Sequence, residues 1–154
     1  MVAIKKEQLL ATLDKIAATP ILVVGDLILD RYIWGKVDRI SPEAPVPVVE
    51  VVKTEGRLGG AGNVVWNLVA IGAKPSVCGL IGDDEDGRDL INLFNEMGVN
   101  VDGIVVDSTR PTTVKTRVIA ATQQIVRIDR EKKIGDSPEA SKKMVEAINR
   151  SIEG

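Results

Sequence analysis

The run Gly59-Gly60-Ala61-Gly62-Asn63 could hold a polar ligand, because it leads directly into an apolar segment of helical character, residues 64–72. A glycine-rich turn at a helix start brings backbone N–H groups close to a bound polar group. The Asn63 side chain adds both a hydrogen-bond donor and an acceptor. Gly59, Gly60 and Asn63 therefore suit a sugar with adjacent hydroxyls.

Two carboxylates, Asp26 and Asp30, follow the apolar run 21–24 and could accept hydrogen bonds from sugar hydroxyls. Residues directly after a parallel strand lie at the carboxyl end of the sheet, where open α/β sheets bind ligands. The alternative is structural: Asp26 stabilises the turn after the strand and Asp30 lies on the surface. The spacing alone favours neither interpretation.

Cationic side chains alternate along a predicted hairpin formed by residues 113–120 and 125–129. Because successive side chains of a strand point to opposite faces, Lys115 and Arg117 share one face, and Arg127 lies on one face of the partner strand. If those faces meet the site, all three are candidate ligands for a substrate phosphate. The alternative is that they are surface cations in cross-strand ion pairs.

Known nucleotide and metal motifs fail when they are tested residue by residue. A GxGxxG dinucleotide fingerprint that starts at Gly60 has Val65 in place of its third glycine. Gly82 and Gly87 have the glycine spacing of a P-loop, but Arg88 follows where a P-loop has lysine. The same stretch lacks the first and last ligands of an EF-hand. The acidic turn between these glycines is interpreted as a solvated turn that precedes a helix, and the alternative is metal binding.

Strands alternate with helices along the chain, which predicts an α/β fold with a largely parallel sheet flanked by helices. Helices are expected over residues 5–18, 62–72, 88–97 and 137–152, and strands over 21–24, 74–81 and 101–106. Ser137 suits the N-cap of the last helix, and the continuous apolar run 21–24 predicts a buried parallel strand. The extended segments 32–53 and 113–129 do not fit a plain βαβ repeat. We place them in a small second sheet over the carboxyl edge of the main sheet.

Residues 45–53 form a β-branched segment with two prolines, which favours an edge strand. Both faces of this segment are mostly apolar, which is unusual for a free edge. The pattern is consistent with a strand that contacts a second subunit.

Composition excludes several classes of function. The chain has 154 residues, 44% hydrophobic and 27% charged, with a net charge of -2, so nothing in its charge favours nucleic acid or an anionic membrane. The sequence contains no histidine, which excludes catalytic triads and HExxH zinc sites within it. Cys78 is the single cysteine and is expected to be a buried, inert thiol. We find neither a signal-peptide core nor an apolar run of membrane-spanning length, so a cytoplasmic location is expected.

Taken together, these segments resemble the ribokinase-like (pfkB) carbohydrate kinase family. The GGAGN run, with Gly72 and then Gly82 downstream, is close to the first signature of that family. Val65 stands where the family usually has a small residue, which predicts a change in packing. Within the family the similarity is greatest to the heptose 7-phosphate kinases, and it rests on residues 23–32, 39–48 and 123–129.

The resemblance assigns roles to several residues. It implies that Asp30 holds substrate hydroxyls and that Gly59, Gly60 and Asn63 form the sugar-binding loop. It also implies that segments 32–53 and 113–129 are a lid over the sugar. Lids of this kind often clasp a second subunit, so we expect a homodimer through strand 46–52.

The resemblance further implies transfer of the γ-phosphoryl group of ATP, with Mg²⁺, to the anomeric hydroxyl of a heptose 7-phosphate, a step toward ADP-heptose and lipopolysaccharide. The family's DTxGAGD-like loop, which supplies the general base and the anion hole, does not occur in this sequence, and neither does an adenylyltransferase HxGH motif.

We therefore expect residues 1–154 to be the N-terminal part of a kinase domain whose ATP-binding half is absent. No catalytic residue, metal site or bound cofactor is expected in this chain, and the chain alone is expected to be inactive and marginally stable. The alternatives are a non-catalytic sugar-phosphate-binding or dimerisation module, and a kinase for another sugar or nucleoside.

Overall fold

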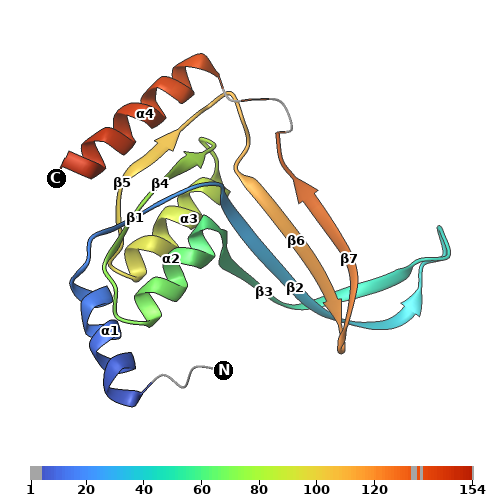
Figure 1. Ribbon diagram of the computed structural model, residues 1–154. Coiled ribbons are helices and arrows are strands. Elements are labelled where there is room, and N and C mark those ends of the chain that lie inside the picture. Colours follow the sequence, from blue (N-terminus) through green and yellow to red (C-terminus); the bar gives the residue numbers. More distant parts are fainter. Residues whose placement is uncertain (1–4, 133–134, 136, 154) are drawn as a thin grey trace.

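The computed structural model describes residues 5–132, 135 and 137–153, which form two sheets and flanking helices (Figure 1). The helices are α1 Lys6–Ala18, α2 Ala61–Ala70, α3 Glu85–Glu96 and α4 Pro138–Glu153. The strands are β1 Ile21–Val24, β2 Leu27–Ile40, β3 Pro47–Gly60, β4 Pro75–Ile81, β5 Asn100–Val106, β6 Thr113–Ala120 and β7 Gln123–Arg130. The predicted α/β class is confirmed.

The first sheet is parallel, with strand order β1-β4-β5. Val77 of β4 belongs to the core formed with α2 and α3, whereas its neighbour Cys78 lies 3.4 Å from Ser151 of α4. Because adjacent strand residues point to opposite faces, α4 covers the face opposite α2 and α3, as Figure 1 shows. Val65 is fully buried in the core.

Strand β1 is parallel, as predicted, but it is only half-buried. Val24 is 48% exposed. A continuous apolar run is typical of a buried parallel strand, so burial was predicted for β1. In the structure β1 is an edge strand of the sheet, and it is the neighbouring β4, between β1 and β5, that is mostly buried.

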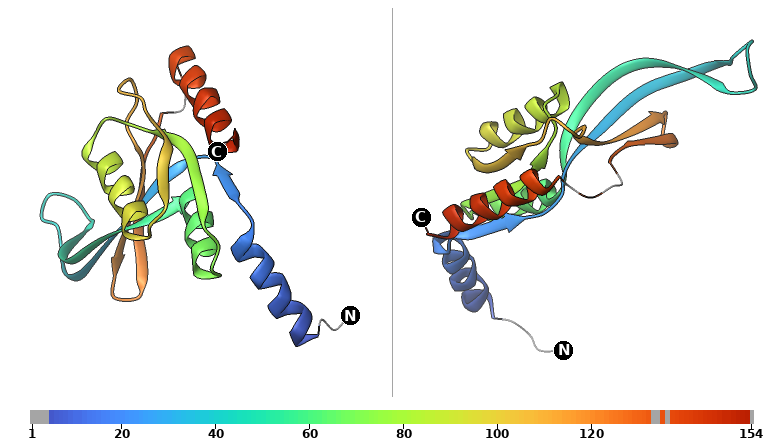
Figure 2. Two further views of the ribbon diagram at one scale, coloured as in Figure 1. Left: turned by 90° about the vertical axis from the view of Figure 1, so that its left-hand side faces the viewer. Right: turned by 90° about the horizontal axis from the view of Figure 1, so that it is seen from above.

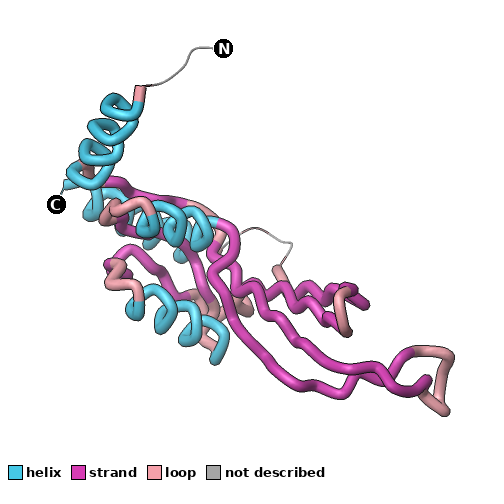
Figure 3. Tube along the Cα trace, turned by 90° about the horizontal axis from the view of Figure 1, so that it is seen from below, coloured by secondary structure: helices cyan, strands magenta, loops and turns pink. Residues whose placement is uncertain are grey.

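The second sheet is mixed and has the strand order β3-β2-β6-β7. Strands β2 and β3 are antiparallel, β2 and β6 are parallel, and β6 and β7 form an antiparallel hairpin. The predicted edge position of residues 45–53 is confirmed, because β3 is paired on one side only. The β2–β3 ribbon is long and twisted and extends away from the helices (Figures 2 and 3).

The second sheet is larger than predicted. It starts at Leu27, not at residue 32, and it includes Gly59 and Gly60, which pair with Ile28 and Leu27. The predicted turn at a helix start is confirmed, since Gly60 caps α2, but the glycine run is also the end of β3, which the sequence did not predict. Gly60 adopts φ 56°, a conformation that favours glycine, where the chain turns into the helix.

The predicted helices are confirmed, with shifted ends. Helix α3 starts three residues earlier than expected, because Asp84 caps it by accepting a hydrogen bond from the Gly87 backbone N–H at 2.9 Å. Helix α4 has the predicted Ser137 cap, whose hydroxyl accepts from the Ala140 N–H at 3.0 Å. Among the described helices, none combines the length and the apolar character needed to cross a bilayer.

Candidate functional site

One face of the second sheet gathers most of the predicted site residues. Asp30 is level with Arg57 of β3 and with Lys115 of β6, and Arg117 is level with Arg127 of β7. Residues level with one another across a sheet share a face. The two halves of the predicted cationic hairpin therefore do face the same side, and that side is the one that carries Asp30.

Asp30 is at the centre of this face. Its carboxylate accepts a hydrogen bond from Arg117 at 2.6 Å, and both side chains are about four-fifths buried. The hydrogen bond to Asp30 raises the pKa of Arg117 above its ordinary value, so the Arg117 guanidinium stays charged. Asp30 is therefore an acceptor held in place by Arg117, and the alternative that it lies on the surface was wrong.

Gly59 lies directly against this carboxylate. A Cβ atom at position 59 would lie 2.6 Å from Asp30 Oδ2, closer than real side-chain contacts allow. Gly60 is equally constrained, since a Cβ there would lie 2.4 Å from the Asp26 carbonyl oxygen. That carbonyl accepts the Ala61 N–H at 2.9 Å, so the Asp26 backbone stabilises the strand-to-helix junction.

The remaining predicted cations lie on the same face in different states. Arg127 forms a two-point ion pair with Asp129, at 2.9 and 3.1 Å. Lys115 is half-buried; its carbonyl accepts a hydrogen bond from Arg117 at 3.4 Å, but within the described ranges its ammonium group has no hydrogen bond or ion pair. The alternative of surface cations in cross-strand ion pairs is thus met only in part: Arg117 pairs across strands but is mostly buried, and Arg127 pairs within its own strand. A role of any of the three cations as phosphate ligand stays a prediction.

The sequence analysis missed an aromatic pair on this face. The rings of Tyr32 and Trp34 stack at 5.4 Å, and Arg57 and Arg117 lie 5.0 and 5.3 Å from the Tyr32 ring. Lys53 lies 5.1 Å from the Trp34 ring. If β2 had been predicted as one strand from Leu27, the alternation of its side chains would have placed Tyr32 and Trp34 on the same face as Asp30.

This face has a net positive charge, whereas the whole chain has a net charge of -2. Around Asp30 to Trp34 and the residues level with them, five cations (Lys53, Arg57, Lys115, Arg117 and Arg127) stand with three carboxylates (Asp30, Glu55 and Asp129), a net charge of +2. Hydrogen bonds from Lys53 and Arg57 hold the pKa of Glu55 below its usual range. A dianionic phosphate would be attracted to such a face.

Asn63 is placed elsewhere. It lies in the first turn of α2 and lines a cavity of about 470 Å³ between α2, α3 and the free edge of β3, with Trp66, Leu93 and Met97. The Asn67 side chain donates to the Asn63 carbonyl at 2.7 Å. The structure brings Asp30, Gly59 and Arg117 together, and within the residues it describes Asn63 has no hydrogen bond to any of them.

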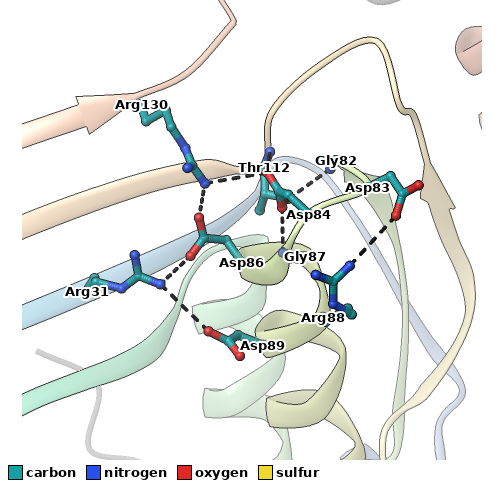
Figure 4. Close-up of polar contacts among 10 residues, drawn as sticks. All are labelled: Arg31, Gly82, Asp83, Asp84, Asp86, Gly87, Arg88, Asp89, Thr112 and Arg130. Atoms are coloured by element: carbon teal, nitrogen blue, oxygen red, sulfur yellow. Dashed lines mark hydrogen bonds and ion pairs between the residues drawn. The ribbon is translucent and has the colours of Figure 1, made fainter.

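The acidic turn 82–87 leads into α3, as predicted, but it is only partly solvated: Asp83 and Glu85 are exposed, whereas Asp86 is not. Asp86 is buried, and its carboxylate accepts hydrogen bonds from Arg31 of β2 and Arg130 of β7 (Figure 4). The P-loop-like glycine spacing has a steric cause. A Cβ at Gly82 would lie 2.5 Å from the Arg110 carbonyl oxygen, and one at Gly87 would lie 2.5 Å from the Gly82 carbonyl oxygen.

Asp84, the cap residue of α3, is also held by hydrogen bonds. Burial raises the pKa of its carboxyl, but hydrogen bonds from Thr112 and Gly87 outweigh that effect and hold the pKa below its usual range. With Arg31 and Arg130 beside these carboxylates, the turn does not suit a divalent cation. The described ranges contain no group of three His, Cys, Asp or Glu residues that could hold a metal ion.

Cys78 is fully buried, as predicted. Its sulfur lies 3.4 Å from the Ser151 hydroxyl, between β4 and α4. This position is typical of a core thiol and offers no access to a substrate.

Comparison with known proteins identifies the family. The profile of the "pfkB family carbohydrate kinase" matches residues 18–150, nearly the whole chain. The chain belongs to the pfkB carbohydrate kinase family. Its curated relatives include the bifunctional protein HldE of Pelobacter propionicus, 52% identical over 141 residues, and that of Geobacter sulfurreducens, 53% identical over 128 residues. These alignments cover 92% and 83% of this chain but only 29% and 26% of the relatives.

Solved structures confirm the ribokinase-like fold. Phosphofructokinase-2 from Escherichia coli, in complex with substrates and products, superposes with a TM-score of 0.64 at 18% identity, over 86% of this chain and 41% of that one. A nucleoside kinase of the ribokinase family from Methanocaldococcus jannaschii gives a TM-score of 0.54 at 14% identity, over 71% and 36%. The chain thus spans well under half of the kinases that share its fold.

Proposed function

We propose that this chain is the sugar-binding part of an ATP-dependent heptose 7-phosphate kinase. The observation that carries the proposal is the Asp30–Arg117 pair packed against Gly59, on a face with a net positive charge. The name HldE of the relatives at about 50% identity supports the same assignment. The product would be a heptose 1,7-bisphosphate on the route to ADP-heptose and lipopolysaccharide.

In this proposal each group has a separate task. The Asp30 carboxylate accepts hydrogen bonds from sugar hydroxyls, and Gly59 leaves space for the sugar beside it. Lys115, Arg117 and Arg127 are candidate partners for the substrate phosphate, and Lys115 is the one that holds no carboxylate among the described residues. Charged hydrogen bonds of this kind fix the position of the reacting hydroxyl, which is the main requirement of phosphoryl transfer.

ATP, Mg²⁺ and the catalytic base are assigned to the rest of the protein. Asp84 and Asp86 of the 82–87 turn are committed to Arg31, Arg130 and Thr112 and do not suit the metal. When bound, Mg²⁺ would neutralise charge on the transferring phosphoryl group. We accordingly propose that residues 1–154 form the N-terminal part of the kinase domain and have no turnover alone, and that the enzyme acts in the cytoplasm.

The substrate is tested with the purified full-length protein that carries this segment. ADP release is measured with heptose 7-phosphate, fructose 6-phosphate and ribose as acceptors. We expect kcat/KM for heptose 7-phosphate to exceed that for ribose by at least about 100-fold, since ribose lacks the phosphate and the charged contacts that it would make. Fructose 6-phosphate keeps a phosphate, so its kcat/KM should also be lower than that of heptose 7-phosphate but by a smaller factor. A preference for another acceptor would reassign the substrate and leave the family unchanged.

Inactivity of the segment is tested in parallel. Residues 1–154 are incubated with ATP, Mg²⁺ and heptose 7-phosphate, and ADP is measured over hours. We expect no release above the background without enzyme. Turnover by the segment would show that it holds its own nucleotide site and base.

A further inference from the structure

A single buried carboxylate, Asp86, links the helical layer to two strands of the second sheet. Its side chain is 7% exposed and accepts hydrogen bonds from both Arg31 of β2 and Arg130 of β7 (Figure 4). Arg130 also lies 3.5 Å from Asp84, and Arg31 lies 3.7 Å from Asp89. We call Arg31, Asp86 and Arg130 the α3 clamp.

The position of Asp86 is fixed by the start of α3. Asp84 accepts the backbone N–H of Thr112 at 3.0 Å and the Thr112 hydroxyl at 2.6 Å. Thr112 is fully buried, and its hydroxyl accepts the Gly82 N–H at 2.9 Å. Since Thr112 directly precedes β6, the first turn of α3 is anchored to the base of the second sheet, and Asp86 projects from that anchored turn.

The α3 clamp and the candidate site lie on opposite faces of the same strands. Arg31 follows Asp30 in β2, and Arg130 follows Asp129 in β7, so each clamp arginine is one residue from a charged group of the site. Adjacent strand residues point to opposite faces. Holding Arg31 and Arg130 therefore holds the backbone that carries Asp30 and the Arg127–Asp129 pair.

The geometry points to Asp86 as a positioning residue for sugar-phosphate binding: by holding Arg31 and Arg130 it orients the second sheet so that Asp30 and Arg127 face the substrate. Asp86 touches no part of the site and acts only through these two strands. This inference rests on the proposed function for the identity of the ligand, but the contacts that carry it are independent of which sugar is bound.

The test uses Asp86→Asn in the full-length protein, with Asp83→Asn as the matched control. Asp83 lies in the same turn, but its side chain is 69% exposed. Its ion pair with the exposed Arg88 is long, at 3.9 Å. Asp86→Asn removes the charge that both arginines share. We expect KM for the sugar phosphate to rise at least tenfold, with KM for ATP within twofold. Asp86→Glu, which keeps a carboxylate, is expected to recover part of the loss, and Asp83→Asn is expected to match the wild type.

A second readout needs no substrate. Amide hydrogen exchange of the unliganded protein is followed in peptides from β2, β7 and β4. Asp86→Asn should speed exchange in β2 and β7 at least tenfold and leave β4 unchanged. Arg130→Gln offers a milder variant should Asp86→Asn fail to fold, because Asp86 then keeps Arg31 as its partner.

The outcomes are distinct. Faster exchange in β2 and β7 together with a selective rise in the sugar KM supports the inference. Unchanged exchange overturns it, and so does faster exchange with an unchanged sugar KM or with an equal rise in both KM values. If the wild type accepts a sugar other than heptose 7-phosphate, the proposed substrate fails, and the α3 clamp is tested with the accepted sugar.

Discussion

Asp30 is the residue on which the candidate site depends most. It combines a held carboxylate, a buried guanidinium partner in Arg117 and a neighbour, Gly59, with no side chain to cover it. The sequence indicated Asp30 but could not decide between a ligand and a surface residue, because spacing carries no information on what lies across the sheet.

Replacing Asp30 should weaken substrate binding selectively. In the full-length protein, Asp30→Asn is expected to lower kcat/KM for the sugar about 10- to 100-fold, since a hydrogen bond to a charged group contributes about 1.5–3 kcal/mol. Steady-state kinetics with both substrates measures the loss. Asp38→Asn, an exposed position further along β2, is the control, and equal losses in the two variants would contradict the assignment.

A methyl group at position 59 should act through Asp30. Gly59→Ala places a Cβ 2.6 Å from the Asp30 carboxylate, so that side chain must move. We expect KM for the sugar to rise at least fivefold, with little change in melting temperature. Gly56→Ala in the same strand meets only the flexible end of Leu29, at 3.2 Å, and should stay within twofold of wild type. The reverse order of the two variants would show that Gly59 has no such role.

The lowered pKa of Asp84 predicts a pH dependence of stability. Its folded pKa lies below the unfolded value of about 3.9, so its contribution is present above that value and is lost as the pH falls through the folded pKa. Thr112→Val removes the hydroxyl that donates to Asp84 and accepts from Gly82, at a cost of about 1–3 kcal/mol.

Urea unfolding at pH 7 and at pH 3 measures this effect. The difference in the free energy of unfolding between wild type and Thr112→Val should be smaller at pH 3, where Asp84 is nearer to protonation. A difference that does not change with pH would mean that Thr112 stabilises the fold without Asp84.

At the scale of elements, the sequence predicted what local patterns determine and missed what pairing determines. The helices and the strands of the parallel sheet followed from apolar periodicity and caps such as Ser137. Strand β2 was predicted only from residue 32, because Leu27–Arg31 read as a loop after β1. The pairing of Leu27 with Gly60 and of Ile28 with Thr113 makes it a strand, and such pairing across 30 to 90 residues leaves no local signal.

The α3 clamp shows the same limit. Asp86, Arg31 and Arg130 are far apart in the sequence, and an acidic residue in the first turn of a helix is ordinary. Only the strand order β3-β2-β6-β7 brings both arginines to one carboxylate.

The ends of β2 and β3 predict a subunit contact. Ile40, Val46, Val51 and Val52 are each more than half exposed there. In the full-length protein, Val51→Asp with Val52→Asp should convert a dimer to a monomer, because two charges would enter an apolar interface. Sedimentation velocity measures the mass, and Thr54→Asp in the same strand is the control. A wild type that is monomeric, or a variant that stays dimeric, would refute a contact through strand 46–52.

For the molecule as a whole, family membership follows from motifs spread over most of the chain, and the fold follows with it. Residues 18–150 match the pfkB profile, and the sequence had already indicated the same family from GGAGN and its flanks. The motifs do not contain the division of the molecule into a body and a long two-stranded ribbon (Figure 2). The ribbon arises because β2 and β3 stay paired as far as Ile40, whereas the pairing of β2 with β6 ends at Gly35.

The segment should be unstable alone. Helix α1 has no buried residue, and β1 and β5 are open edges of the parallel sheet. Residues 1–154 are expected to self-associate at micromolar concentration, since unpaired edges recruit other strands. Sedimentation at several concentrations, with urea unfolding, measures this. A monomer that unfolds cooperatively at low concentration would show that the two sheets are sufficient for a stable fold.

The strict alternation of Asp30 and Arg31 has a consequence for which changes of length this family can tolerate. Inserting or deleting one residue between Leu27 and Arg31 would exchange the faces of the two side chains, turning the site carboxylate toward α3 and the clamp arginine toward the sugar. Beyond Trp34 the register already shifts at two places, between Trp34 and Gly35 and between Val37 and Arg39. Natural insertions and deletions in β2 should therefore be confined to the part of the strand beyond Trp34, where its pairing with β3 is already irregular.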